Sequence, residues 1–148
     1  MNGHLIDTNV ISEFSNQSPC LEVREWLESA DPETLFVSVI TVGEIRLGIE
    51  NLPVGKRRVE LEIWFAKGLP AWFAAKLLPV TPAIADRWGR LTVQARRKGI
   101  TISTADGLIA ATALEHNLTL VTRNTRDFSG LGLSLLDPWQ SDPRQIQP

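Results

Sequence analysis

Three short apolar segments of this chain each lead into an acidic residue, although the segments lie far apart in the sequence. The segments and their acids are Met1–Ile6 with Asp7, Leu35–Val39 with Glu44, and Ile100–Ser103 with Asp106. If the segments are parallel strands, the acids meet at the carboxyl edge of one sheet, where open α/β folds place their ligands. Neighbouring carboxylates repel one another unless a cation lies among them. Because hard divalent cations prefer oxygen ligands, the pattern predicts a site for Mg²⁺ or Mn²⁺.

Length and composition fit one globular domain. The chain has 148 residues, of which 43% are apolar and 22% are charged, and this suits a single hydrophobic core. We expect the domain to span residues 1–140. Residues 141–148 are polar and contain two prolines, so we expect them to form a flexible tail.

The expected cellular setting follows from features that the sequence lacks. No apolar run approaches the ~20 residues that cross a bilayer. The first residues show no basic segment before an apolar one, so we expect no secretion signal. One cysteine, Cys20, allows no internal disulfide and favours a reducing, cytoplasmic location. Together with His4 and His116 it is too small a set for a zinc site.

Alternating patterns along the chain predict strands and helices in turn. Strands are expected over residues 4–6, 35–39, 77–80, 118–122 and 133–136. Helices are expected over residues 8–14, 21–29, 41–52, 56–67, 71–76, 81–98 and 105–116, with a break at Gly68–Pro70 between the fourth and the fifth. This alternation is typical of an α/β protein with three layers (α/β/α) and a central, mainly parallel sheet.

Each acid also has a purely structural interpretation as a helix cap. Glu44 lies three residues after Thr41, which is the spacing of a capping box. Asp106 lies three residues after Ser103, and Asp7 is placed to cap the first helix. Taken singly, capping explains each acid as well as a metal site does. Taken together, three acids at equivalent strand ends favour the metal site, because capping does not require that coincidence.

A fourth position at the same edge is less sharply defined. Asn124 and Asp127 follow the strand expected at residues 118–122. Asn124 offers a neutral oxygen to a metal ion or its water, and Asp127 offers a further charge if the loop turns inward. Both residue types are also common in turns, so the sequence leaves the fourth position open between them.

Several segments of the chain resemble one family. They are Ile6–Glu13, Ile40–Gly48, Ala105–Ala113, Val121–Asn124 and the closing Leu136–Trp139. These segments resemble the PIN-domain ribonucleases, and among them the VapC-like toxins of type II toxin–antitoxin systems, particularly the FitB-like group. The resemblance extends from Leu5 to Trp139. It implies a PIN-like α/β/α fold and a Mg²⁺- or Mn²⁺-dependent endoribonuclease activity.

The resemblance also implies roles for the acids. Asp7, Glu44 and Asp106 fall on three acidic positions of the family, where Asp7 and Asp106 would bind the principal ion. Glu44 would complete the metal site or orient the attacking water. The fourth position often reads Thr-x-Asp in the family, whereas here Thr122-Arg123-Asn124 ends on an amide. This departure favours one tightly held ion and a second one recruited with the substrate.

Polar and basic side chains near the acids are expected to support RNA cleavage. Hydrogen bonds to waters or phosphate oxygens are expected from Thr8, Asn9 and Thr122. Salt-sensitive contacts to the RNA backbone are expected from Arg46, Arg87, Arg90 and Arg123. The net charge of −2 argues against a broad basic surface, so we expect such contacts to be local.

Aromatic residues near the expected helix break suggest a second surface. They lie in Ile63–Phe65 and Leu69–Phe73, and either anchor a protein partner or pack in the core. The resemblance implies a homodimer and a separately encoded antitoxin whose apolar segment occupies a groove near the active site. It implies contact with DNA only through the antitoxin. An antitoxin arginine reaching the acids would be a suitable inhibitor.

Three other classes of protein fit this sequence less well than a ribonuclease does. A haloacid-dehalogenase-like phosphatase needs Asp-x-Asp after the first strand, and Asp7-Thr8-Asn9 lacks the second acid. A response-regulator receiver needs a late lysine, and none follows Lys98. A flap-type DNA nuclease needs a larger basic surface. The remaining alternative is a catalytically weak PIN-like binding module that acts in a DNA-bound complex with its antitoxin.

Overall fold

A computed structural model describes residues 3–73 and 76–140, except for the side chains of residues 69–73. Five strands form one sheet in the order β3-β2-β1-β4-β5, and every neighbouring pair is parallel. The strands are β1 (His4–Ile6), β2 (Leu35–Ser38), β3 (Leu77–Leu78), β4 (Thr119–Val121) and β5 (Leu135–Leu136). The predicted parallel sheet is confirmed. The tail expected at residues 141–148 lies outside the described residues.

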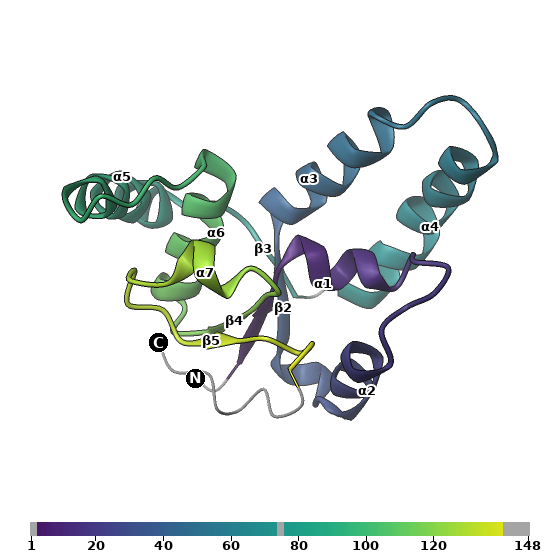
Figure 1. Ribbon diagram of the computed structural model, residues 1–148, viewed down its shortest axis with the longest axis horizontal. Coiled ribbons are helices and arrows are strands. Elements are labelled where there is room, and N and C mark those ends of the chain that lie inside the picture. The colour runs from purple at the N-terminus through teal and green to yellow at the C-terminus, as the bar shows by residue number, and fades with distance from the viewer. Residues whose placement is uncertain (1–2, 74–75, 141–148) are drawn as a thin grey trace.

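Helices cover both faces of the sheet (Figure 1). They are α1 (Thr8–Glu13), α2 (Leu21–Ser29), α3 (Val39–Glu50), α4 (Lys56–Phe73), α5 (Pro82–Arg97), α6 (Thr104–Glu115) and α7 (Thr125–Phe128), with a short 3₁₀ helix at Pro32–Thr34. Helices α1 to α4 contribute to the core on one face, and α5 to α7 contribute to the core on the other. This is the expected three-layer architecture.

The two cores follow from the alternation of side chains along each strand. Leu5 of β1 and Leu120 of β4 face α5 and α6, where Ile109 and other buried residues surround them. Their chain neighbours Ile6 and Val121 face α1, α2 and α3. All five side chains are completely buried. Because both faces of these strands are covered, their sequences are apolar without alternation.

One expected helix boundary is wrong, and the error concerns a candidate site residue. Helix α3 begins at Val39 rather than at Thr41, because the Ser38 hydroxyl accepts a hydrogen bond from the Ile40 amide at 3.0 Å and caps the helix. Thr41 is instead completely buried within the first turn. The expected Thr41–Glu44 capping box therefore does not exist, and the side chain of Glu44 is free for another role.

The helix break expected at Gly68–Pro70 is also wrong, since α4 continues from Lys56 to Phe73. A proline within a helix costs about 3 kcal/mol but interrupts only local hydrogen bonds. Leu61, Trp64 and Phe65 of the same helix pack against the second core, and this packing opposes the cost. These three residues therefore contribute to the core, whereas the side chains of Trp72 and Phe73 lie outside the described part.

Within residues 3–73 and 76–140, no helix combines the length and the apolar character required to cross a bilayer.

Candidate active site

Asp7 lies where β1 ends and α1 begins. Its carboxylate caps α1, because Oδ1 accepts a hydrogen bond from the Thr8 amide at 2.8 Å. The other oxygen, Oδ2, accepts a hydrogen bond from the Thr122 hydroxyl at 2.7 Å. Only 3% of Asp7 is exposed. Asp7 is therefore both a helix cap and a buried acid, so the two interpretations of this residue are compatible.

The Thr122 hydroxyl links Asp7 to the loop after β4. Ile6 pairs with Val121 in the sheet, so the residues that follow, Asp7 and Thr122, are neighbours at the carboxyl edge. Thr122 Oγ1 also accepts hydrogen bonds from the Asn9 amide group at 3.3 Å and from the Asn124 backbone at 3.0 Å. Asn9 Oδ1 in turn accepts from the Arg123 backbone at 3.2 Å. These bonds fix the orientation of the Asp7 carboxylate.

Glu44 lies at the end of a short chain of hydrogen bonds that includes two threonine hydroxyl groups. Thr8 Oγ1 lies 2.6 Å from Glu44 Oε1 and 3.3 Å from Thr41 Oγ1. A hydroxyl has one proton and an ionised carboxylate can only accept, so Thr8 donates to Glu44 and Thr41 donates to Thr8. From the sequence we expected Thr41 to cap the helix, and we did not predict its contact with Thr8. The Thr41–Glu44 spacing fits a capping box, and it also brings the two side chains near one another on the helix.

Asp106 lies in the first turn of α6. The Ser103 hydroxyl caps this helix by accepting a hydrogen bond from the Asp106 backbone at 3.2 Å, so the predicted cap is confirmed. The cap uses the backbone of Asp106 rather than its carboxylate. Helix α6 packs against α3 as well as α5, which brings the starts of α3 and α6 to the same edge of the sheet.

The acids affect one another electrostatically. Burial raises the pKa of Asp7 to about 6, against the opposing hydrogen bonds from Thr122 and Thr8, and the charges of Asp106 and Glu44 raise it further. Burial also raises the pKa of Asp106, and the charges of Glu44 and Asp127 add to that increase, while a hydrogen bond from Ser103 opposes it. The residues expected from the sequence therefore form one cluster of interacting negative charges.

Asp127 and Asn124 occupy different places in the loop and helix after β4. Asp127 lies in the first turn of α7 and is close enough for its charge to raise the pKa of Asp106. Asn124 is exposed at the start of α7, where its side chain makes no capping bond and its backbone N–H donates to Thr122. The charge of Asp127 therefore reaches Asp106, whereas Asn124 adds no charge to the cluster.

The donor atoms fit a hard divalent cation. They are carboxylate and hydroxyl oxygens, and the interacting acids carry charge that a cation would neutralise. In the described part of the chain, no three acidic, histidine or cysteine side chains are placed to enclose an ion. Mg²⁺ does not require such an enclosure, because it commonly binds one or two carboxylates and keeps several of its waters.

Arg46, one of the four arginines expected to contact RNA, points away from the acids. Although it lies two residues after Glu44, its guanidinium pairs with Glu62 at 2.9 Å and with Glu50 at 3.3 Å. The same group lies over the Phe65 ring, 4.5 Å from its centre. The guanidinium of Arg46 is therefore already paired with the carboxylates of Glu62 and Glu50 in the same chain.

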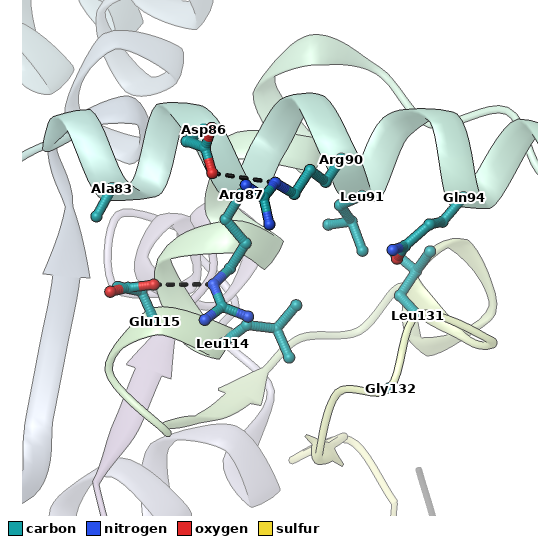
Figure 2. Close-up of a pocket in the computed structure, with 10 residues that line it drawn as sticks. All are labelled: Ala83, Asp86, Arg87, Arg90, Leu91, Gln94, Leu114, Glu115, Leu131 and Gly132. Carbon is teal, nitrogen blue, oxygen red and sulfur yellow. Dashed lines mark hydrogen bonds and ion pairs between the residues drawn. The ribbon is translucent and has the colours of Figure 1, made fainter.

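Arg87 and Arg90 line a separate pocket of about 490 Å³ between α5, the end of α6 and the loop before β5 (Figure 2). Arg87 pairs with Glu115 at 2.8 Å, and Arg90 pairs with Asp86 at 3.2 Å. Glu115 is the last residue of α6, whereas Asp106 lies in the first turn of that helix. The pocket is therefore at the opposite end of α6 from the acids.

Arg123 has the most suitable position among the four arginines. It follows Thr122 directly, is exposed, and lies over the Trp139 ring at 5.1 Å from the ring centre. No carboxylate within the described residues forms an ion pair with it. Its charge is thus available beside the acidic cluster.

Comparison with known proteins identifies the family. The family model of the PIN domain matches residues 4–132, which include all the acids described above. The chain belongs to the PIN domain family. Its VapC- and FitB-like character is shown by relatives of similar length, one of which is the VapC ribonuclease Y4jK of Sinorhizobium fredii. That protein is 39% identical over 137 residues, covering 92% of this chain and 97% of the relative.

Two further comparisons support this assignment of the PIN domain. Toxin FitB of Neisseria gonorrhoeae is 38% identical over 135 residues, covering 91% of this chain and 97% of the relative. The solved structure of FitAB bound to a DNA fragment matches with a TM-score of 0.87 and 36% identity, covering 94% of this chain and 97% of that chain. Other solved structures with this fold include a toxin–antitoxin complex and DNA-bound VapBC complexes.

The role of Thr122 in this PIN domain can be tested through stability. We expect Thr122→Val to lower the free energy of unfolding by about 1–3 kcal/mol, because Asp7 loses a buried donor and two donors lose their acceptor. Thr122→Ser keeps the hydroxyl and should lose much less. Urea unfolding of both variants at pH 7.5 in EDTA measures the difference. Equal stability of the valine variant and the unmodified protein would contradict this role.

Proposed function

We propose that this chain is a metal-dependent endoribonuclease that acts as the toxin of a type II toxin–antitoxin pair. One observation carries the proposal: at the carboxyl edge of a PIN domain, burial and the charges of Asp106 and Glu44 raise the pKa of Asp7, and burial and the charge of Glu44 raise the pKa of Asp106. The name of a full-length relative, VapC ribonuclease, supports RNA as the substrate. The name of another, toxin FitB, supports the role in a toxin–antitoxin system.

Mg²⁺ or Mn²⁺ is the proposed cofactor, with Asp7 and Asp106 as its principal ligands and Glu44 beside them. When bound, such an ion lowers the pKa of an attacking water and neutralises charge on the phosphate. The raised pKa of Asp7 supports this role, because an acid that is costly to ionise when alone is stabilised by a neighbouring cation. The exposed side of Asp106 gives the substrate access.

The residues around the acids have distinct parts in the proposed hydrolysis of a phosphodiester bond. Thr8 and Thr122 hold the two oxygens of Asp7 in a fixed orientation. Thr8 also occupies Oε1 of Glu44, which leaves Oε2 to orient a water and accept its proton. Arg123 is placed to contact the RNA backbone, and this contact should weaken as salt is added. Arg46, Arg87 and Arg90 are less suitable because carboxylates already pair with them.

A groove beside the acids is the proposed site of the antitoxin. It has a volume of about 440 Å³ and lies between α1, α3 and α4. Thr8 and Glu44 line its end at the active site, and Ile45, Ile49 and Trp64 line its apolar part. An apolar antitoxin segment would fit here, with an arginine extending to the acids. A homodimer, and DNA contact only through the antitoxin, are part of the same proposal.

The alternative function is a catalytically weak binding module within a DNA-bound complex. It is supported by the similar FitAB structure, which is bound to a DNA fragment. Cleavage of end-labelled tRNA and of a structured mRNA separates the two functions. The protein, purified free of antitoxin, should cut RNA in Mg²⁺ and lose that activity in EDTA. A folded protein that cuts neither RNA in Mg²⁺ or Mn²⁺ would favour the binding module.

A further inference from the structure

Trp139 lies in a turn that directly follows β5, at the carboxyl edge of the sheet. The Thr122 backbone N–H donates to the Leu136 carbonyl at 2.9 Å, so the residues after β5 lie beside those after β4. Asp137 is only 5% exposed, and its Oδ1 accepts a hydrogen bond from the Trp139 backbone at 2.9 Å. The Gln140 backbone N–H donates to the Asp137 carbonyl at 3.2 Å and closes the turn. The turn therefore has a fixed place beside the loop after β4.

The indole of Trp139 supports the guanidinium of Arg123. The indole is partly buried and packs against the second core, and the guanidinium carbon lies 5.1 Å from the centre of the ring. At the other end of the same residue, the Arg123 backbone N–H donates to Asn9 Oδ1 at 3.2 Å. The backbone and the side chain of this arginine therefore both have a defined position.

Arg123 is held in a different way from the three other arginines considered above. Carboxylates pair with Arg46, Arg87 and Arg90 and compensate their charge. Within residues 3–73 and 76–140, the guanidinium of Arg123 forms no ion pair or hydrogen bond. An aromatic ring attracts a cation to its face but carries no net charge. Trp139 therefore fixes Arg123 while leaving its charge and its N–H donors available.

We infer that Trp139 is a positioning residue that holds Arg123 for contact with an RNA phosphate next to the one that is cleaved. This inference rests on the proposed ribonuclease function. A guanidinium whose plane is fixed can donate two parallel hydrogen bonds to a phosphate. The ends of β1 and β5 lie two strand spacings, roughly 10 Å, apart, so Arg123 contacts a neighbouring nucleotide. Such a contact contributes to substrate binding rather than to the chemical step.

The salt dependence of RNA binding tests this inference, because Trp139 carries no charge of its own. The affinity of a fluorescein-labelled single-stranded RNA is measured in the Asp106→Asn background, which is expected to bind RNA without cutting it, from about 50 to 200 mM KCl. Arg123→Gln should reduce the slope of log affinity against log salt by about 0.7, the value for one phosphate contact. Trp139→Leu should reduce the slope by a similar amount, whereas Trp139→Phe, which keeps a ring, should retain most of it.

The slope also separates this role from two others that Trp139 could have. A base stacked on the indole, or a general loss of packing, would change the affinity but not the number of phosphate contacts. An unchanged slope in Trp139→Leu would therefore overturn the inference even if the affinity falls.

A double-mutant cycle provides a second test. If Trp139 acts through Arg123, Trp139→Leu should weaken RNA binding about 5-fold when Arg123 is present and less than about 2-fold in Arg123→Gln. Trp26→Leu is the matched control, because Trp26 also packs against the second core but contacts His4, the first residue of β1. It should change RNA binding less than about 2-fold. Equal effects of Trp139→Leu with and without Arg123 would overturn the inference.

Cleavage kinetics distinguish a failure of this inference from a failure of the proposed function. In the protein with Asp106 intact, Trp139→Leu should raise KM for RNA about 5-fold and change kcat less than about 2-fold. A fall in kcat at unchanged KM would overturn the positioning role. Cleavage by the unmodified protein reports on the ribonuclease function, whereas the salt slope in Asp106→Asn does not depend on cleavage.

Discussion

Asp106→Asn should reduce RNA cleavage at least about 10³-fold while leaving the fold intact. A ligand carboxylate that places a cation at the reacting phosphate contributes several kcal/mol to transition-state stabilisation, and each 1.36 kcal/mol changes the rate about tenfold. The α6 cap should survive, because Ser103 accepts from the backbone of residue 106 rather than from its side chain. Single-turnover cleavage in Mg²⁺ and circular dichroism measure the two effects.

Asp86→Asn is the matched control for this experiment. Asp86 is likewise a helical aspartate, but it is exposed and pairs with Arg90 in the pocket at the far end of α6. We expect its loss to change cleavage less than about 2-fold, because an exposed ion pair contributes little. Wild-type cleavage by Asp106→Asn, or an equal loss in both variants, would contradict the assignment of Asp106.

Asp7→Asn should abolish cleavage and make the metal-free protein more stable at neutral pH. The pKa of Asp7 is raised to about 6 from 3.8, so ionising it at pH 7.5 costs about 3 kcal/mol. Asparagine removes that charge and is an equally good helix cap, but it loses a charge-assisted bond worth about 2 kcal/mol. We expect a net gain of about 1 kcal/mol, or roughly 3 °C in Tm.

The gain in stability should depend on pH. Because the folded pKa of Asp7 lies above the ordinary value, its unfavourable contribution is absent below pH 4, appears as the pH rises through 4 to 6, and is complete above pH 6. The stability difference between Asp7→Asn and the unmodified protein should follow the same course. Urea unfolding in EDTA from pH 4 to 8 measures it. A variant that is less stable at pH 7.5 would contradict the buried charge.

The fold was predictable because its determinants are local. Apolar strands followed by helices indicate a parallel sheet whatever the detailed packing, and the acids at the strand ends indicate the functional edge. The errors arose where tertiary contacts outweigh local signals. Ser38 caps α3 in place of Thr41, and packing of Leu61, Trp64 and Phe65 carries α4 past Pro70.

The placement of the three acids was predictable, but their contacts were not. Asp7, Glu44 and Asp106 lie at the expected edge, and their interaction depends on charges that the sequence already shows. By contrast, the ion pairs of Arg87 with Glu115 and of Arg46 with Glu62 join residues 28 and 16 positions apart. Such pairings follow from helix packing, so no sequence pattern could remove these arginines from the RNA-binding candidates.

A close contact between Trp88 of α5 and Gly107 of α6, where a Cβ on the glycine would lie 2.8 Å from the indole, was missed for the same reason. The small residues around Asp106 indicated space and close helix packing, and the structure shows which side chain uses that space. A glycine directly after a candidate catalytic acid is the sequence signal that could have led to it.

Asp7 and Asp106 are proposed to bind the same cation, and calorimetric titration with Mn²⁺ measures that binding without RNA. Protein freed of metal by EDTA and exchanged into chelator-free buffer at pH 7.5 should bind Mn²⁺, and so should Asp86→Asn. Asp7→Asn and Asp106→Asn should each bind Mn²⁺ at least about 10-fold more weakly, because each removes a charged oxygen ligand. Equal Mn²⁺ affinity in all four proteins, or no binding by the unmodified protein, would show that Asp7 and Asp106 do not form a cation site.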